Sequence, residues 1–252
     1  MTIESERDYD GIMSAGRAVA QVRDAMIGSV EPGMTTAELD EIGQRLLDAL
    51  GANSAPRVTY GFPGATCISI NEEAAHGVPG PRVIQAGDIV NVDVSAELDG
   101  YYADTGATTI APPGSTLKTR LCHATELALA GALAQARAGA RINRIGRAIQ
   151  RVASSHGFKV IRNLAGHGIG RELHEEPDGI VSFFDRHDPR TLRCGQVVAI
   201  EPFLSTRSSH VSEGADGWAL IGHAENLSAQ FEHTVIITRG RPIVATMSAS
   251  IR

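Results

Sequence analysis

Residues 91–105 read NVDVSAELDGYYADT, two strand-like runs joined by the dipeptide Asp99-Gly100. Asp-Gly between β-rich runs predicts a hairpin with a two-residue turn. In that register Asp93 lies opposite Gly106, and Asp104 lies opposite Ser95. Because side chains alternate along a strand, both carboxylates point to the same face of the hairpin.

The opposite face of this hairpin carries Val90, Val92 and Val94, which we expect to face the core. The aspartates then lie on the other side of the sheet, inside a folded domain. Two aligned carboxylates repel each other there unless a proton or a metal ion neutralises them. On the hairpin alone, a half-exposed sheet with solvated aspartates is the alternative.

Composition limits the class of protein. The chain has 252 residues, 42% hydrophobic and 21% charged, with a net charge of -6 and no basic run, which argues against a nucleic-acid partner. Its cysteines are Cys67, Cys122 and Cys194; they form no C-x-x-C motif, which favours a reducing compartment. The N-terminus lacks a signal-peptide pattern, and no apolar run reaches bilayer length. We expect a cytoplasmic protein with no membrane partner.

Helices and strands are expected to alternate in two similar series. The first helix is expected to be capped by Asp10, and the second by a Thr35–Glu38 capping box. A loop over 52–65 should precede a strand at 66–70. The series repeats with helices over 117–128 and 142–152 and strands over 158–161, 197–201, 218–221 and 231–238. This order predicts an α+β fold, with a mostly antiparallel sheet covered by helices, in one domain of two similar halves spanning 1–252.

Further ionisable residues stand in apolar or glycine-rich surroundings: His167, His174, Glu201 and Glu232. Each alone has an ordinary explanation, as a buried histidine, a salt-bridged strand end or a solvated face. Together with the two aspartates, they supply mainly oxygen donors and one nitrogen. That set suits a pair of divalent ions such as Mn, Fe, Co or Zn better than a thiolate zinc site. The GHGIG run at 166–170 does not match the dinucleotide-binding pattern.

The chain resembles the type I methionine aminopeptidases over nearly its whole length. The order and spacing of five residues match the family's metal ligands: Asp93, Asp104, His167, Glu201 and Glu232. Supporting motifs are CISIN (67–71), HGVPG (76–80), DVSAELDGYYAD (93–104), GHGIGRELHEEP (166–177), AIEPFL (199–204) and SAQFEHT (228–234). The resemblance implies the pita-bread fold, with two pseudo-symmetric halves. It also implies removal of the initiator methionine when the second residue is small.

The resemblance also implies roles for these residues. Asp104 and Glu232 would bridge two metal ions, Asp93 would complete one site, and His167 with Glu201 the other. His76, His174 and Glu201 would be catalytic. Positions that hold a monovalent cation in some relatives correspond to Asn71, Glu73 and Ser228. The implied partners are the N-terminal methionine of nascent polypeptides and the ribosome, and we expect a monomer.

Selecting methionine requires a deep apolar slot with a polarisable lining, for which the candidates are Tyr60, Phe62, Cys67 and Trp218. The chain departs from its relatives here. Thr59 stands where an aromatic residue is usual, and Leu173 where phenylalanine or methionine is frequent. Smaller walls should loosen the packing around the thioether without admitting a charged side chain.

Two alternatives share the fold. Prolidases and aminopeptidase P, which cleave X-Pro bonds, resemble the family but carry a long additional N-terminal domain, whereas 92 residues precede Asp93 here. Type II enzymes carry a long insertion between the histidine ligand and the first glutamate ligand. Here His167 and Glu201 are only 34 positions apart, so that insertion is absent. A non-catalytic pita-bread binding protein is the second alternative. Such proteins characteristically lose metal ligands.

Overall fold

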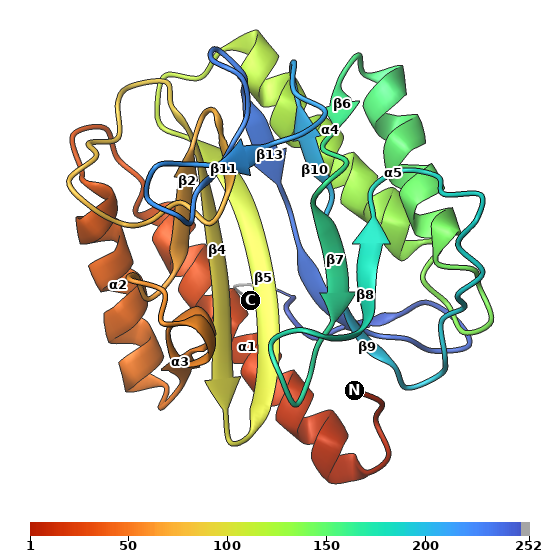
Figure 1. The fold of residues 1–252 in the computed structure, drawn as a ribbon. Coiled ribbons are helices and arrows are strands. Elements are labelled where there is room, and N and C mark those ends of the chain that lie inside the picture. Colours follow the sequence, from red (N-terminus) through yellow and green to blue (C-terminus); the bar gives the residue numbers. More distant parts are fainter. Residues whose placement is uncertain (248–252) are drawn as a thin grey trace.

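The computed structural model describes residues 1–247, which form two halves lying side by side (Figure 1). In chain order the elements are α1 (Glu6–Gly28), α2 (Thr36–Ala49), β1 (Asn53–Ser54), α3 (Ala55–Tyr60), β2 (Cys67–Ile70), β3 (Glu73–Ala75), β4 (Ile89–Leu98), β5 (Tyr101–Ile110), α4 (Thr116–Leu133), α5 (Asn143–Ser155), β6 (Lys159–Val160), β7 (Ala165–Gly168), β8 (Glu175–Val181), β9 (Val197–Ile200), β10 (Phe203–Ser205), β11 (Ser212–Glu213), β12 (Leu220–Ile221), β13 (Ser228–Gln230), β14 (His233–Ile236) and β15 (Ile243–Val244).

The hairpin of β4 and β5 has the predicted register. Asp93 pairs with Gly106, and Ser95 pairs with Asp104. The turn residues Asp99 and Gly100 have φ values of 52° and 81°, the left-handed conformation that a type I′ turn requires at both positions. The prediction made from the Asp-Gly dipeptide is therefore confirmed.

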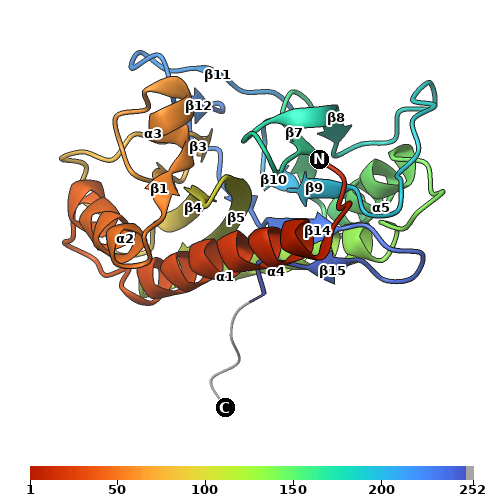
Figure 2. The same ribbon diagram turned by 90° about the horizontal axis from the view of Figure 1, so that it is seen from below.

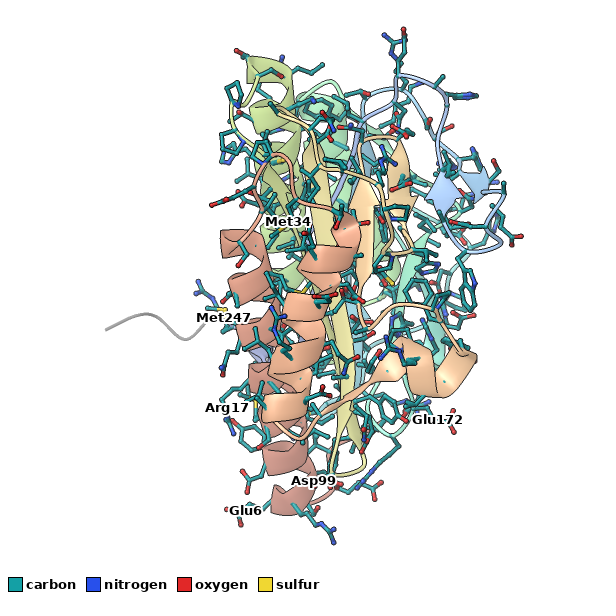
Figure 3. The ribbon with its side chains drawn as sticks, turned by 90° about the vertical axis from the view of Figure 1, so that its left-hand side faces the viewer. Glu6, Arg17, Met34, Asp99, Glu172 and Met247 are labelled. Atoms are coloured by element: carbon teal, nitrogen blue, oxygen red, sulfur yellow. The ribbon has the colours of Figure 1, made fainter. Side chains whose placement is uncertain are left out.

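In the first half, α1 and α2 cover the valine face of this hairpin. Val90, Val92 and Val94 are fully buried in one apolar cluster with Val19 and Leu39 from these helices. Figure 3, in which Glu6 and Arg17 mark α1, shows that helix on the outer side of the hairpin. Burial of this face leaves the face with Asp93 and Asp104 directed toward the second half.

In the second half, α4 and α5 pack against a sheet in the order β15-β14-β9-β7-β8. Leu121 and Ile145 of these helices are buried with Val198, Ile200 and Val235 of the sheet. Helix α1 reaches this half as well, and Figure 2 shows it passing below β5 toward β14. A Cβ added to Gly16 of α1 would lie 2.5 Å from the carbonyl oxygen of Ala245. The helix therefore ties both halves together.

The fold prediction is confirmed as a mixture of helices and antiparallel sheets, since the strand pairings throughout the described residues are antiparallel. Two local expectations were wrong. Ser5, not Asp10, caps α1, because its side chain accepts from the amide of Asp8. The expected loop over 52–65 contains β1 and α3, a short helix with Pro56 in its first turn and Gly61 at its left-handed end.

The Thr35–Glu38 capping box is confirmed at the start of α2, with both reciprocal hydrogen bonds present. Among the described residues, no helix combines the length and apolar character needed to cross a bilayer.

Candidate metal centre

A cavity of about 360 Å³ lies at the meeting point of the two halves. Its lining includes His76, Asp93 and Asp104 from the first half, and His167, His174 and Glu201 from the second. Residues that are far apart in the sequence therefore surround one space. All the candidate ligands and catalytic residues lie at this cavity or, for Glu232, directly beside it.

Asp93 and Asp104 lie diagonally on one face of the hairpin. Burial raises the pKa of both carboxyl groups, and the charge of Asp104 raises the pKa of Asp93 further. Two carboxylates held this close are unfavourable without a neutralising cation. The structure thus contains the expected pair of carboxylates aligned on one face, with Asp104 buried and Asp93 partly buried.

Glu232 lies between β13 and β14 and is almost fully buried. Its Oε2 accepts a hydrogen bond of 2.9 Å from the side-chain amide of Gln230. That amide group rests against Gly106, where an added Cβ would lie 1.9 Å from the Gln230 Oε1. Gln230 is a supporting residue that the sequence analysis missed, although it stands inside the SAQFEHT motif.

His167 is positioned by strand β7, where its Nδ1 lies 2.9 Å from the carbonyl oxygen of Gly168. A carbonyl can only accept, so Nδ1 carries the proton and Nε2 is left with a free lone pair. That Nε2 lies 3.7 Å from a carboxylate oxygen of Glu201 and 3.9 Å from one of Asp104. A backbone carbonyl holding the outer nitrogen is the usual support for a metal-binding histidine.

The donor atoms fit a divalent cation. One ligand atom from each of Asp104, His167 and Glu232 lies within 4.8 Å of the others. Asp104 Oδ1 and Glu232 Oε1 are buried without a hydrogen-bond partner in the structure. Buried carboxylate oxygens are costly unless something compensates them. Burial also raises the pKa of Glu201 and of Glu232, and the charges of neighbouring carboxylates raise both values further. A cation would satisfy both oxygens and offset this repulsion.

His76 and His174 line the same cavity without belonging to the compact donor group. His76 has a φ of 55°, and burial lowers its pKa. Burial lowers the pKa of His174 to about 4, helped by the neighbouring His167 and His76, so its ring is neutral near pH 7. The rings of His167 and His174 lie 4.1 Å apart between centroids.

The residues expected to form a methionine pocket all line this cavity. Phe62 and Trp218 meet edge to face, with ring centroids 5.2 Å apart, a favourable aromatic geometry. Cys67 is buried and pairs with Asp93 in the sheet, and burial holds its pKa well above the usual range of a thiol. Tyr60 differs from a plain apolar wall, because its ring is half exposed and its hydroxyl contacts Nδ1 of His174.

The positions associated with a monovalent cation lie close together. The amide of Ser228 donates to the carbonyl oxygen of Asn71 over 2.9 Å, and a Glu73 carboxylate oxygen accepts from the amide of Ile70 over 2.8 Å. Asn71 has a φ of 55°, which turns the chain at this point. The structure thus brings Asn71 and Ser228 together, and a cation there stays a prediction.

This arrangement of donors in an antiparallel α+β fold is that of a metallopeptidase. Residues 10–239 match the model of metallopeptidase family M24, and the chain belongs to this family.

Within the family, the chain is similar to methionine aminopeptidases. The chain is 44% identical to methionine aminopeptidase 2 of Bacillus subtilis over 98% of its own length and 99% of that protein. It is 38% identical to the methionine aminopeptidase of Aquifex aeolicus, again over 98% of this chain and 99% of the relative. The family resemblance inferred from the sequence motifs is confirmed.

Solved structures agree with this assignment. A methionine aminopeptidase from Thermotoga maritima superposes with a TM-score of 0.94 at 33% identity, covering 98% of this chain and all (100%) of that one. Prolidase from Pyrococcus furiosus superposes with a TM-score of 0.78 at 21% identity, and 66% of that chain is covered. The prolidase therefore shares the fold and extends beyond it.

Proposed function

We propose that this chain is a metal-dependent aminopeptidase that removes the N-terminal methionine of nascent polypeptides when the second residue is small. The observation that carries the proposal is the buried cluster of carboxylates around His167, with two unpaired carboxylate oxygens, directly beside an aromatic cavity. The methionine aminopeptidases to which the chain is similar support the same activity.

Two divalent ions, of Mn, Fe, Co or Zn, are the proposed cofactors. Asp104 and Glu232 would be shared between them, with Asp93 completing one site and His167 with Glu201 the other. When bound, such ions activate water for attack and polarise a peptide carbonyl. The uncompensated oxygens of Asp104 and Glu232 support their role as shared ligands.

The chain's own residues would handle protons and developing charge. His174 has a neutral ring at the cavity and can donate a hydrogen bond to the substrate carbonyl oxygen as negative charge develops there. Glu201 can accept a proton from the attacking water and return it to the leaving amine. His76, on the first half, would contact the scissile amide nitrogen. Substitution of either histidine by alanine should lower kcat while metal content is retained.

Phe62, Trp218 and Cys67 would receive the methionine side chain, since thioethers interact well with aromatic rings. The second residue of the substrate must pass His76 and His174, so we expect only Gly, Ala, Ser or Thr there. Norleucine should be tolerated. Discrimination against leucine should be modest, because one branch in an apolar pocket changes binding by about 1–3 kcal/mol.

We further propose that residues 1–252 form one catalytic domain. It would be active as a monomer in the cytoplasm, where nascent chains are made. The ribosome and a monovalent cation near Asn71 are further proposed partners.

A peptide panel tests the function. The Mn²⁺-loaded protein should release methionine from Met-Ala-Ser and not from Met-Lys-Ser. An Asp104→Asn variant, equal in size but short of one charge, should fold and yet lose turnover. Efficient release of N-terminal Lys, Glu or Phe from matched tripeptides would contradict the assignment of a methionine pocket.

Two other results would redirect the assignment. Cleavage of an X-Pro dipeptide without cleavage of Met-Ala-Ser would indicate a prolidase. Metal binding without hydrolysis of any peptide would indicate a binding protein.

A further inference from the structure

Tyr60 and His174 come from distant parts of the chain and meet at the cavity. Tyr60 is the last residue of α3, and His174 lies in the segment between β7 and β8. The Tyr60 hydroxyl lies 2.6 Å from Nδ1 of His174, and the two ring centroids are 5.7 Å apart at an angle of 45°. This distance is that of a strong hydrogen bond.

The Tyr60 side chain is 51% exposed, so its position does not follow from tight packing. Within residues 1–247, its hydroxyl makes no other hydrogen bond. Phe62, two residues later, is 2% exposed and meets Trp218 edge to face. These two aromatic residues therefore differ. Phe62 packs in the pocket, whereas Tyr60 makes one specific polar contact.

The direction of this hydrogen bond fixes where the imidazole proton lies. A neutral imidazole carries one N–H, and its other nitrogen can only accept. Burial, together with the nearby Glu172 carboxylate, raises the pKa of the Tyr60 phenol, so the hydroxyl keeps its proton and can donate. If it donates to Nδ1, the proton of His174 must be on Nε2. With Nδ1 occupied, Nε2 is also the nitrogen left free for a substrate.

We propose that Tyr60 is a positioning residue that donates a hydrogen bond to Nδ1 of His174 and holds this ring in its Nε2–H form. In its Nε2–H form, His174 presents an N–H to the substrate carbonyl oxygen, where negative charge develops during attack. A ring with the proton on Nδ1 would present a lone pair to that oxygen and repel it. This inference rests on the proposed function for its catalytic consequence, whereas the tautomer itself can be observed without turnover.

The hydrogen bond that holds Nδ1 of His174 differs from the one that holds Nδ1 of the neighbouring candidate ligand His167. His167 is held through Nδ1 by the backbone carbonyl of Gly168, which accepts, so its Nε2 is a lone pair suited to a cation. His174 is held through Nδ1 by a hydroxyl that donates, so its Nε2 is an N–H suited to an oxyanion. The partner of Nδ1 thus gives two adjacent histidines opposite functions.

Nitrogen chemical shifts test the tautomer directly. The protein would be labelled with ¹⁵N-histidine and loaded with diamagnetic Zn²⁺, and a His174→Gln variant would identify the His174 signals. Long-range ¹H–¹⁵N correlation should show Nε2–H for His174 in the wild type and a mixture of tautomers in Tyr60→Phe. Tyr9→Phe, on α1, is the matched control and should leave the His174 pattern unchanged. An Nδ1–H ring or an imidazolium in the wild type, or an unaltered ring in Tyr60→Phe, would overturn the proposal.

Kinetics on Met-Ala-Ser separate positioning from pocket formation. Tyr60→Phe should lower kcat about threefold to tenfold while KM changes by less than about twofold, because the lost hydrogen bond acts in the transition state. A rise in KM with unchanged kcat would make Tyr60 a pocket wall only, and would also overturn the proposal. If the wild type cleaves no methionyl peptide, the proposed function fails, and the nitrogen shifts still decide the tautomer.

Discussion

His233 follows the candidate ligand Glu232 directly but belongs to a different environment. Its Nδ1 lies 2.8 Å from the Thr246 hydroxyl oxygen. Burial, together with the positive charge of Arg23, lowers its pKa to about 4. A histidine in the unfolded chain has a pKa of about 6.5. Between the folded and the unfolded pKa, the folded protein therefore binds fewer protons than the unfolded chain. The contribution of His233 to stability is fully present above the unfolded pKa and is lost as the pH falls toward the folded pKa.

A His233→Gln variant should flatten this part of the pH dependence. From the two pKa values, we expect the wild type to lose about 2 kcal/mol more stability than the variant between about pH 7 and about pH 5. Urea unfolding of both proteins in EDTA at each pH measures the difference. Parallel pH curves would mean that His233 is not buried as a neutral ring.

At the residue scale, the sequence predicted those side chains whose positions follow from strand register. Asp93 and Asp104 share a face because the Asp-Gly turn sets the pairing, and register is a local property. Gln230 and the contact of Tyr60 with His174 could not be predicted in this way. They depend on the packing of segments that are far apart in the chain.

At the element scale, β5 passes close to the Gln230 side chain of β13 at Gly106. A Cβ on Gly106 would overlap the Gln230 amide, with 1.9 Å between the new carbon and Oε1. The Gln230 backbone cannot retreat easily, because its carbonyl oxygen and amide both bond to the hydroxyl of Thr108. Gly106 is thus required for β13 to hold the amide that supports Glu232.

Gly106→Ala should consequently damage both stability and metal binding. Overpacking of this kind costs about 1–3 kcal/mol. Displacing the hydrogen-bond partner of a ligand should lower metal affinity by roughly 10-fold to 100-fold. Urea unfolding and calorimetric titration with Zn²⁺ measure the two effects. Gly28→Ala at the end of α1, where an added Cβ meets no atom within 4 Å, is the control. Wild-type affinity in Gly106→Ala would contradict a supporting role for Gln230.

Elements with strong local signals were predictable, and weakly marked ones were not. The capping box of α2 is a reciprocal hydrogen-bond pattern written in four consecutive residues. By contrast, α3 has six residues and no side-chain cap, too short to display a helical period. It forms because Pro56 and Gly61 define its ends and neighbouring strands hold it. The missed element is also the one that positions Tyr60.

At the scale of the whole molecule, the candidate ligands come from both halves. Asp93 and Asp104 lie on the first-half hairpin. In the second half, His167 lies in β7, Glu201 directly follows β9, and Glu232 lies between β13 and β14. Metal-free, these carboxylates repel one another across the junction. A bound cation would convert that repulsion into attraction between the halves. Metal binding and global stability should therefore be linked.

Thermal unfolding with and without Mn²⁺ measures this linkage. An ion that binds only the folded state stabilises the wild type by about 2.7 kcal/mol at a concentration of 100 times Kd. Asp104→Asn should change the stability of the metal-free protein and its response to Mn²⁺ in opposite directions. Its metal-free form should be at least as stable as the metal-free wild type, because one repelling charge is gone, while Mn²⁺ should raise its Tm far less. Asp10→Asn, on the exposed side of α1, should respond like the wild type. An equal rise in Tm for wild type and Asp104→Asn would place the stabilising ion away from Asp104 and contradict the shared-ligand assignment.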